Sequence, residues 1–227
     1  RSFFYRPAGT ETYQEINLQP TGDGSVLAGT IPGSAVTVRG VDYYASLAAE
    51  DLTLTFPLEN PASNPAWLPV QFDELTPDGS FTPDTYRMIS IPAVLDERDV
   101  ADVFAAYGPY EPERWRVVRW DPQDEAYRDL PDLEEMPVAP GQAFWLITRD
   151  GEPFTVPSGE ATDASRPYPI TLQPGWNQIG NPFTLPVQLA SIEWPERVED
   201  PVRFDGQAFQ RDVQQLQPWT GYFVYNT

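Results

Sequence analysis

The chain contains no cysteine, no histidine and no lysine among its 227 residues, and all 14 of its basic residues are arginine. The absence of cysteine excludes disulfide bonds and thiol chemistry. The absence of histidine excludes a Ser-His-Asp triad and nearly all zinc and copper sites. The absence of lysine excludes Schiff-base catalysis and the lysine of a phosphate-binding loop. Most common catalytic machinery is therefore excluded before any motif is considered.

Carboxylates are the catalytic groups that remain, because two of them can act as acid and base in glycoside hydrolysis. With 34 acidic residues, however, carboxylate pairs arise by chance and indicate nothing specific. No G-x-G-x-x-G motif occurs, so a dinucleotide site has no support either. We therefore predict that the chain is not an enzyme, with a carboxylate-based hydrolase as the least favoured alternative. We assign it no catalytic residues and no cofactor, and we consider calcium as the one candidate ion.

Positive charge and long apolar runs are also scarce. The net charge of −20 at pH 7 should repel nucleic-acid backbones and anionic lipids. No run approaches the ~18 apolar residues of a membrane-spanning helix, so membrane insertion is not expected. The acidity has two interpretations. Adaptation to high salt is favoured, since arginine is retained and lysine is missing; the other is an acidic surface that collects calcium or a cationic partner.

Aromatic residues and proline are abundant, with 7 Trp, 11 Tyr, 12 Phe and 26 Pro. A disordered chain would be poor in aromatics, so the chain should fold. Proline interrupts helices and central strands, which favours short elements and many turns. We predict a mainly β fold: a partial immunoglobulin-like sandwich, then a duplicated β unit of strand, short helix, hairpin and strand.

Residues 1–57 carry several alternating strand patterns, from Phe3–Arg6 to Leu52–Phe56, and Thr21–Gly24 is a strong hairpin signal. The segments FFYRPAGTETYQEI and GVDYYASLAAEDLTLTFP resemble the later strands of immunoglobulin-like or fibronectin-III-like modules of bacterial surface proteins. The resemblance implies a β-sandwich that is incomplete at its N-terminal side. Residues 58–84 are rich in proline and are expected to form a connector.

Residues 85–227 show an internal duplication, with copies at about 85–150 and 168–227. Ile89, Pro92 and Leu95 recur at a constant offset of 90 residues, and an aromatic-Asp turn follows in each copy. In the first copy, Asp96 is the expected cap of a helix that ends at Gly108. Its apolar stripe has helical spacing: Val100, Val103, Phe104 and Tyr107. The second copy supports only a turn or two at Val187–Trp194.

The segment PGWNQIGNPF resembles a signature near the C-termini of secreted multidomain bacterial proteins. The resemblance implies an extracellular or cell-surface setting and neighbouring domains of a longer parent chain as partners. Both ends of the sequence have strand patterns, which agrees with a piece of a longer protein. For Asn177 and Asn181 in this segment, we expect amide groups that bind local backbone rather than a ligand.

Tryptophan and acidic residues supply the candidate binding sites. Exposed tryptophan rings can stack on sugars or hold peptide side chains, whereas rings at repeated positions are expected to fill a core. Trp115 and Trp219 lack an aromatic counterpart in the other copy, so they are the predicted ligand-binding residues for a glycan or a peptide. Asp121, Asp124 and Glu125 share one turn and are the candidate calcium ligands, with a solvated acidic hairpin as the favoured alternative.

These patterns favour a non-catalytic structural or attachment module of a secreted or cell-surface bacterial protein. A carbohydrate- or peptide-binding accessory module that uses exposed Trp and Tyr is the alternative. The second alternative is the carboxylate-based hydrolase.

If the acidity is an adaptation to salt, the melting temperature should rise substantially between dilute buffer and molar NaCl, because counterions screen the repulsion between carboxylates. Differential scanning calorimetry measures this shift. A flat response would contradict the adaptation, and a large rise with millimolar calcium alone would favour the ion site.

Overall fold

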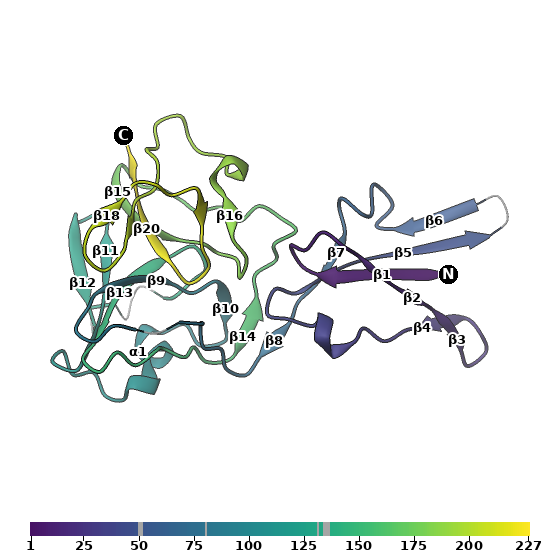
Figure 1. The fold of residues 1–227 in the computed structure, drawn as a ribbon, viewed down its shortest axis with the longest axis horizontal. Helices are drawn as coiled ribbons and strands as arrows, with labels where there is room; N and C mark the ends of the chain where they lie inside the picture. The colour runs from purple at the N-terminus through teal and green to yellow at the C-terminus, as the bar shows by residue number, and fades with distance from the viewer. Residues whose placement is uncertain (50–51, 80, 131, 134–136) are drawn as a thin grey trace. The chain divides into compact units, whose positions relative to one another are not determined.

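A computed structural model shows that the chain is mainly β, as predicted (Figure 1). The residues that the structure describes are 1–49, 52–79, 81–130, 132–133 and 137–227. The described chain divides into two compact units. Unit 1 comprises Arg1–Val70 and Ala161–Pro167, and unit 2 comprises Gln71–Glu160 and Tyr168–Thr227. No helix in the described part of the chain is long and apolar enough to cross a membrane.

Unit 1 contains an antiparallel sheet in the order β2-β1-β5-β6, and β7 also pairs with β5. Its strands are β1 (Ser2–Pro7), β2 (Gln14–Asn17), β5 (Val41–Ala49), β6 (Leu52–Phe56) and β7 (Ala66–Leu68), with the hairpin of β3 (Gln19–Thr21) and β4 (Val26–Ala28) beside them. A small buried core contains Tyr5, Ala35 and Val41. Large apolar side chains on β5 and β6 lie in water: Leu47, Leu52, Leu54 and Phe56.

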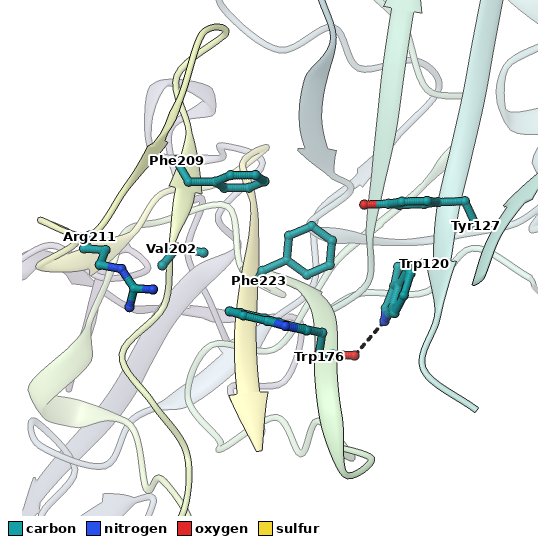
Figure 2. Close-up of a pocket in the computed structure, with 7 residues that line it drawn as sticks. All are labelled: Trp120, Tyr127, Trp176, Val202, Phe209, Arg211 and Phe223. Carbon is teal, nitrogen blue, oxygen red and sulfur yellow. Dashed lines mark hydrogen bonds between the residues drawn. The ribbon is translucent and has the colours of Figure 1, made fainter. Parts of the chain in front are cut away.

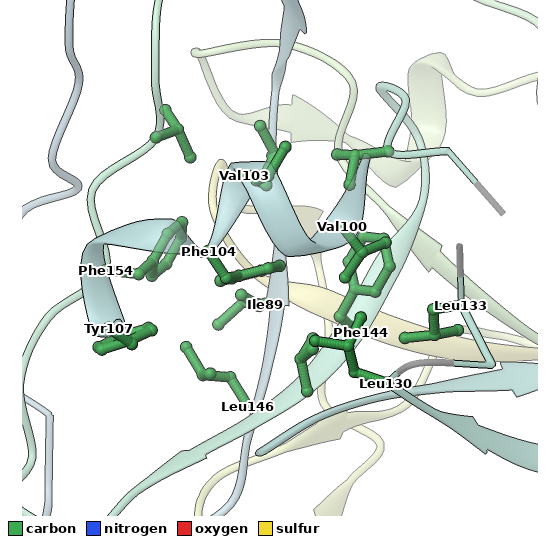
Figure 3. Close-up of a cluster of buried hydrophobic side chains, with 14 of the residues drawn as sticks. Ile89, Val100, Val103, Phe104, Tyr107, Leu130, Leu133, Phe144, Leu146 and Phe154 are labelled. Carbon is green, nitrogen blue, oxygen red and sulfur yellow. The ribbon is translucent and has the colours of Figure 1, made fainter. Parts of the chain in front are cut away.

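The first half of unit 2 is a four-stranded antiparallel sheet in the order β12-β11-β13-β9. Its strands are β9 (Arg87–Ser90), β11 (Trp115–Asp121), β12 (Ala126–Asp129) and β13 (Ala143–Thr148). Successive side chains point to opposite faces of a sheet. Val117 and Phe144 therefore enter the main core on one face, whereas Val118 and Trp145 belong to a second cluster on the other. Figure 3 shows the main core, with Phe104 of the helical segment beside Phe144.

The helical segment consists of α1 (Val100–Val103) and the 3₁₀ turn η2 (Ala105–Tyr107). The predicted apolar stripe is confirmed, because Val100, Val103, Phe104 and Tyr107 are all buried. The predicted cap Asp96 is wrong. Asp99 caps α1 by accepting a hydrogen bond from Ala101 N at 2.8 Å, and Asp96 instead accepts one from the Ser158 hydroxyl at 2.6 Å. The sequence could not show that a distant residue would engage Asp96.

The second half of unit 2 contains two two-stranded sheets, β17-β18 and β15-β20, and a bridge between Val202 and Phe223 joins them in the order β18-β17-β20-β15. These strands are β15 (Gly175–Gly180), β17 (Arg203–Phe204), β18 (Phe209–Gln210) and β20 (Gly221–Asn226). Reciprocal hydrogen bonds between Val202 and Phe223, at 2.9 and 3.0 Å, connect β17 to β20. The order is the same as that of β12-β11-β13-β9 in the first half.

The registers of the two halves also correspond. Ile89 lies opposite Phe144 in the first half, and Ile179 lies opposite Tyr222 in the second. Trp120 lies opposite Tyr127, as Phe204 lies opposite Phe209. Each half therefore directs an aromatic pair from its hairpin to one face of its sheet.

The two halves meet through backbone contacts at equivalent positions. Ser90 N donates to Trp219 O at 3.2 Å, and Gly180 N donates to Gly141 O at 2.9 Å. Gly141 and Trp219 share a left-handed backbone, with φ of 82° and 62°. A Cβ on Gly180 would lie 2.2 Å from Ser90 Cβ, and one on Gly221 would lie 2.5 Å from Met88 Cγ. The sheets approach so closely only because these two residues are glycine.

Two buried asparagines fix the backbone near this junction, as predicted. Asn177 Nδ2 donates to Gln173 O at 2.7 Å and to Gly175 O at 2.9 Å. Asn181 Nδ2 donates to Leu185 O at 2.8 Å and to Leu216 O at 2.9 Å.

The remaining elements are β8 (Gln71–Phe72), β10 (Ala93–Leu95), β14 (Gly159–Ala161), β16 (Val187–Gln188), β19 (Gln215–Leu216) and the 3₁₀ turns η1 (Gly33–Ala35) and η3 (Leu189–Ser191). The turn η3 is the short helical element expected in the second copy.

Replacing Gly180 by alanine should lower the free energy of unfolding by about 2–3 kcal/mol, because the new methyl group would overlap Ser90 and Gln142 O. Urea denaturation followed by tryptophan fluorescence measures the change. Gly33→Ala is the matched control, since nothing lies within 4 Å of its added Cβ. Equal unfolding midpoints for the two variants would contradict the close junction.

Candidate functional site

One face of unit 2 carries a group of aromatic side chains, three of them exposed, that we call the aromatic surface. It consists of Trp120, Tyr127, Trp176, Phe209 and Phe223 (Figure 2). Tyr127 is 53% exposed, Phe209 52% and Trp176 40%. With Val202 and Arg211, these residues line a hollow of about 300 Å³. Large aromatic rings in water are costly, so their grouping around a hollow marks a candidate binding site.

A second hollow of about 390 Å³ adjoins the first, because Tyr127 and Phe209 line both. Its other lining residues are Tyr86, Arg116, Val118, Trp145 and Phe204. Tyr127 and Phe209 come from the equivalent hairpins of the two halves. The two hollows therefore form one continuous apolar surface with these two rings between them.

Strand alternation places the first half's contribution. Trp120 lies two residues after Val118 on β11, so the two side chains point to the same face of the sheet, away from the main core. Tyr127 lies opposite Trp120 on β12, and the two rings meet edge to face at 5.0 Å. An edge-to-face pair of this kind is a favourable aromatic arrangement. The hairpin thus holds both rings on the same face.

Hydrogen bonds attach this hairpin to the second half. Trp120 Nε1 donates to Trp176 O at 2.7 Å, shown as the dashed line in Figure 2. Trp120 N donates to Gln178 Oε1 at 2.8 Å. The indole N–H is therefore already satisfied within the protein. What Trp120 offers a ligand is its apolar ring.

The second half supplies a packed aromatic floor. Phe209 lies 5.3 Å from Phe204 and 6.1 Å from Phe223, measured between ring centroids. Trp145 of the first half lies 5.2 Å from Phe204. Trp176 packs edge to face against Phe223 at 6.1 Å. These mutual contacts restrict ring rotation, so the surface is organised before any ligand binds.

The charged groups at the second hollow are paired. Arg116 Nε donates to Asp129 Oδ2 at 2.7 Å, and Arg116 Nη2 also donates to this carboxylate. The Tyr110 hydroxyl donates to the other oxygen of Asp129. Burial, followed by the hydrogen bond to Asp129, raises the pKa of Tyr110 to about 12. The tyrosine therefore stays protonated at neutral pH and keeps donating to the carboxylate.

The candidate calcium ligands lie in the β11–β12 turn. Asp121 Oδ1 accepts from Gln123 N at 2.9 Å, and its Oδ2 lies 3.5 Å from Arg128 Nε. Asp124 also pairs with Arg128, and Glu125 has a left-handed backbone with φ of 49°. Among the residues that the structure describes, no three acidic side chains are grouped to hold a metal ion. The structure gives Asp121 and Asp124 turn-forming and ion-pairing contacts.

The predicted ligand-binding tryptophans lie elsewhere. Trp115 is only 3% exposed, and its indole N–H donates to Pro109 O at 3.2 Å, so its predicted exposure is wrong. Trp219 is half-buried, with its ring centroid 5.8 Å from that of Phe154. The lack of an aromatic counterpart in the other copy does not imply exposure. Strand alternation was the better indicator of burial, because Trp115 lies two residues before the core residue Val117 on β11 and points to the same face.

The sequence predictions selected none of the five rings of the aromatic surface as ligand-binding residues, and Tyr127 and Trp176 are among the exposed ones. Both lie on strands, and their side chains point to the face opposite to the one that enters the core. Comparisons with protein-family models, with curated proteins and with solved structures each found no match to this chain.

The tryptophans at these positions should differ in their access to acrylamide. Trp176→Phe should remove a readily quenched part of the fluorescence, because Trp176 is 40% exposed. The matched variant Trp115→Phe should remove a poorly quenched part, since Trp115 is buried. Stern–Volmer plots compare the two. A larger loss of quenching in Trp115→Phe would contradict the described surface.

Proposed function

We propose that the chain is a non-catalytic attachment module whose aromatic surface binds an extended peptide segment with apolar side chains. The observation that carries the proposal is the group of exposed rings around two adjoining hollows. Buried Trp and Tyr side chains supply most of the energy of many protein interfaces. Grooves lined by such rings take proline-rich or aromatic peptide segments, whose side chains fill successive hollows.

The lining residues favour a peptide over a glycan. Sugar binding uses an aromatic ring together with carboxylates or amides that bind hydroxyl groups. Among the described lining residues of the two hollows, the polar ones are Tyr86, Arg116, Tyr127 and Arg211, and none is a carboxylate or an amide. Arg116 already binds Asp129. The net charge of −20 favours a peptide that is also cationic.

We also propose that the module belongs to a secreted or cell-surface protein, with neighbouring domains of a longer chain as partners. The resemblance to immunoglobulin-like modules and to the PGWNQIGNPF signature supports this setting. The absence of His, Cys and Lys supports a non-catalytic role. The equal strand order and register of the two halves of unit 2 support an origin by duplication.

Selection from a random-peptide display library tests the binding proposal. We expect a consensus with proline or aromatic residues and with basic residues. Trp176→Ala and Tyr127→Ala should each weaken the selected peptide by about 2 kcal/mol, roughly thirtyfold, as at other aromatic hot spots. Isothermal titration calorimetry measures the affinities.

Phe56→Ala is the matched control, because Phe56 is an equally exposed aromatic residue in unit 1, at 57%. It should leave peptide binding unchanged. A glycan microarray forms the other arm of the test. Enrichment of glycans that depends on Trp176, without any peptide consensus, would replace the peptide by a carbohydrate. No ligand in either arm would overturn the proposal.

A further inference from the structure

A separate cavity of about 280 Å³ lies beside the aromatic surface, with Trp120 as a shared wall. We call it the Arg119 cavity, because Arg119 is the charged residue among its described lining residues. The other walls come from the end of β11 and the turn after it, from the loop that precedes β13, from the segment that precedes β15, and from β15 itself. All of the lining residues belong to unit 2.

Arg119 brings an unpaired cation to this cavity. Its side chain points to the same face of β11 as that of Val117, and its guanidinium carbon lies 5.7 Å from the centre of the Phe144 ring. Its Nε is buried and has no hydrogen-bond partner, and Arg119 forms no ion pair with any residue that the structure describes. Burial lowers the pKa of Arg119, and Asp121 opposes this effect. A buried guanidinium N–H without an acceptor costs free energy until an acceptor arrives.

The acidic residue nearest along the strand is already engaged. Asp121 is two residues further along β11, but one of its oxygens accepts from turn amides and the other lies 3.5 Å from Arg128. The chain contains 34 acidic residues. A shortage of carboxylates therefore does not explain why Arg119 has no acidic partner.

Gln178 also lines this cavity and has a second buried donor without a partner. Its Oε1 accepts the hydrogen bond from Trp120 N, which fixes the orientation of the amide. Its Nε2 is buried and has no partner. Met88 occupies the equivalent position on β9 in the first half, so the strand register itself does not require an amide there.

We propose that the Arg119 cavity binds a carboxylate group. A guanidinium presents parallel N–H donors that match the two oxygens of a carboxylate, and the Gln178 amide supplies a further donor. A monoanion balances the single charge of Arg119, whereas a dianion such as sulfate would leave an uncompensated charge in a partly buried site. The proposal is independent of peptide binding by the aromatic surface.

Nuclear magnetic resonance on ¹⁵N-labelled protein tests the proposal directly. Sodium acetate is titrated against sodium chloride at constant ionic strength, and the side-chain resonances of Arg119 Nε and Gln178 Nε2 are followed. We expect both to shift saturably with acetate and not with chloride. Equal shifts with chloride, or no shift with either salt, would overturn the carboxylate site.

Three variants locate the effect. Arg119→Met should weaken acetate binding at least about tenfold, and Gln178→Met, which introduces the residue found in the other half, should weaken it less. Arg203→Met is the matched control, because Arg203 occupies the equivalent position on β17 and does not line the cavity. An equal loss of acetate binding in Arg203→Met and Arg119→Met would overturn the assignment to this cavity.

The source of the carboxylate is distinguished by three probes: acetate, N-acetylglycine and glucuronate. They represent a free organic acid, a peptide C-terminus and an acidic sugar. The melting temperature should rise with the preferred probe in the wild type and in Trp176→Ala, but not in Arg119→Met. A rise that also persists in Arg119→Met would reflect general screening and would overturn the proposal, whereas peptide binding by the aromatic surface is scored separately.

Discussion

The backbone junction between the halves of unit 2 is the contact on which the rest of this unit depends. Two equivalent hydrogen bonds, from Ser90 N to Trp219 O and from Gly180 N to Gly141 O, connect the two sheets without intervening side chains. Glycine at positions 180 and 221 makes this approach sterically possible. Because the sheets are so close, the hairpin of the first half reaches β15 of the second. The hydrogen bond from Trp120 to Trp176 O follows from that proximity.

Strand alternation then divides the side chains of β11 between two environments. Trp115 and Val117 enter the main core, while Val118 and Trp120 face the aromatic surface. Arg119 continues the core-facing series, but at a point where the core gives way to a cavity. One strand therefore serves the core, the aromatic surface and the Arg119 cavity. The main side chains proposed to bind ligands, Tyr127, Trp176 and Arg119, lie on strands, which favours defined ligand geometry.

Much of the fold class could be predicted because it depends on local patterns. The N-terminal strands and the helical segment from Val100 to Tyr107 each appear in the structure where the sequence places them. The amide contacts of Asn177 are local in sequence as well. The errors concern partners that are distant in sequence. Asp96 binds Ser158 instead of capping α1, and Trp115 is buried by contacts that a comparison of repeat copies could not show.

The sequence by itself determined that the chain is rich in short strands and that it has none of the side chains required for thiol, imidazole or amine chemistry. These conclusions depend on composition and on neighbours within a few residues. Only the tertiary structure decided which aromatic rings lie in water and which arginine lacks an acidic partner. Tyr127 and Trp176 share one surface because segments 56 and 58 residues apart are hydrogen-bonded at Trp120. The exposure of an aromatic ring and the ion pairing of an arginine both depend on such distant contacts. A strand pattern determines to which face a side chain points, but it does not determine which residues cover that face.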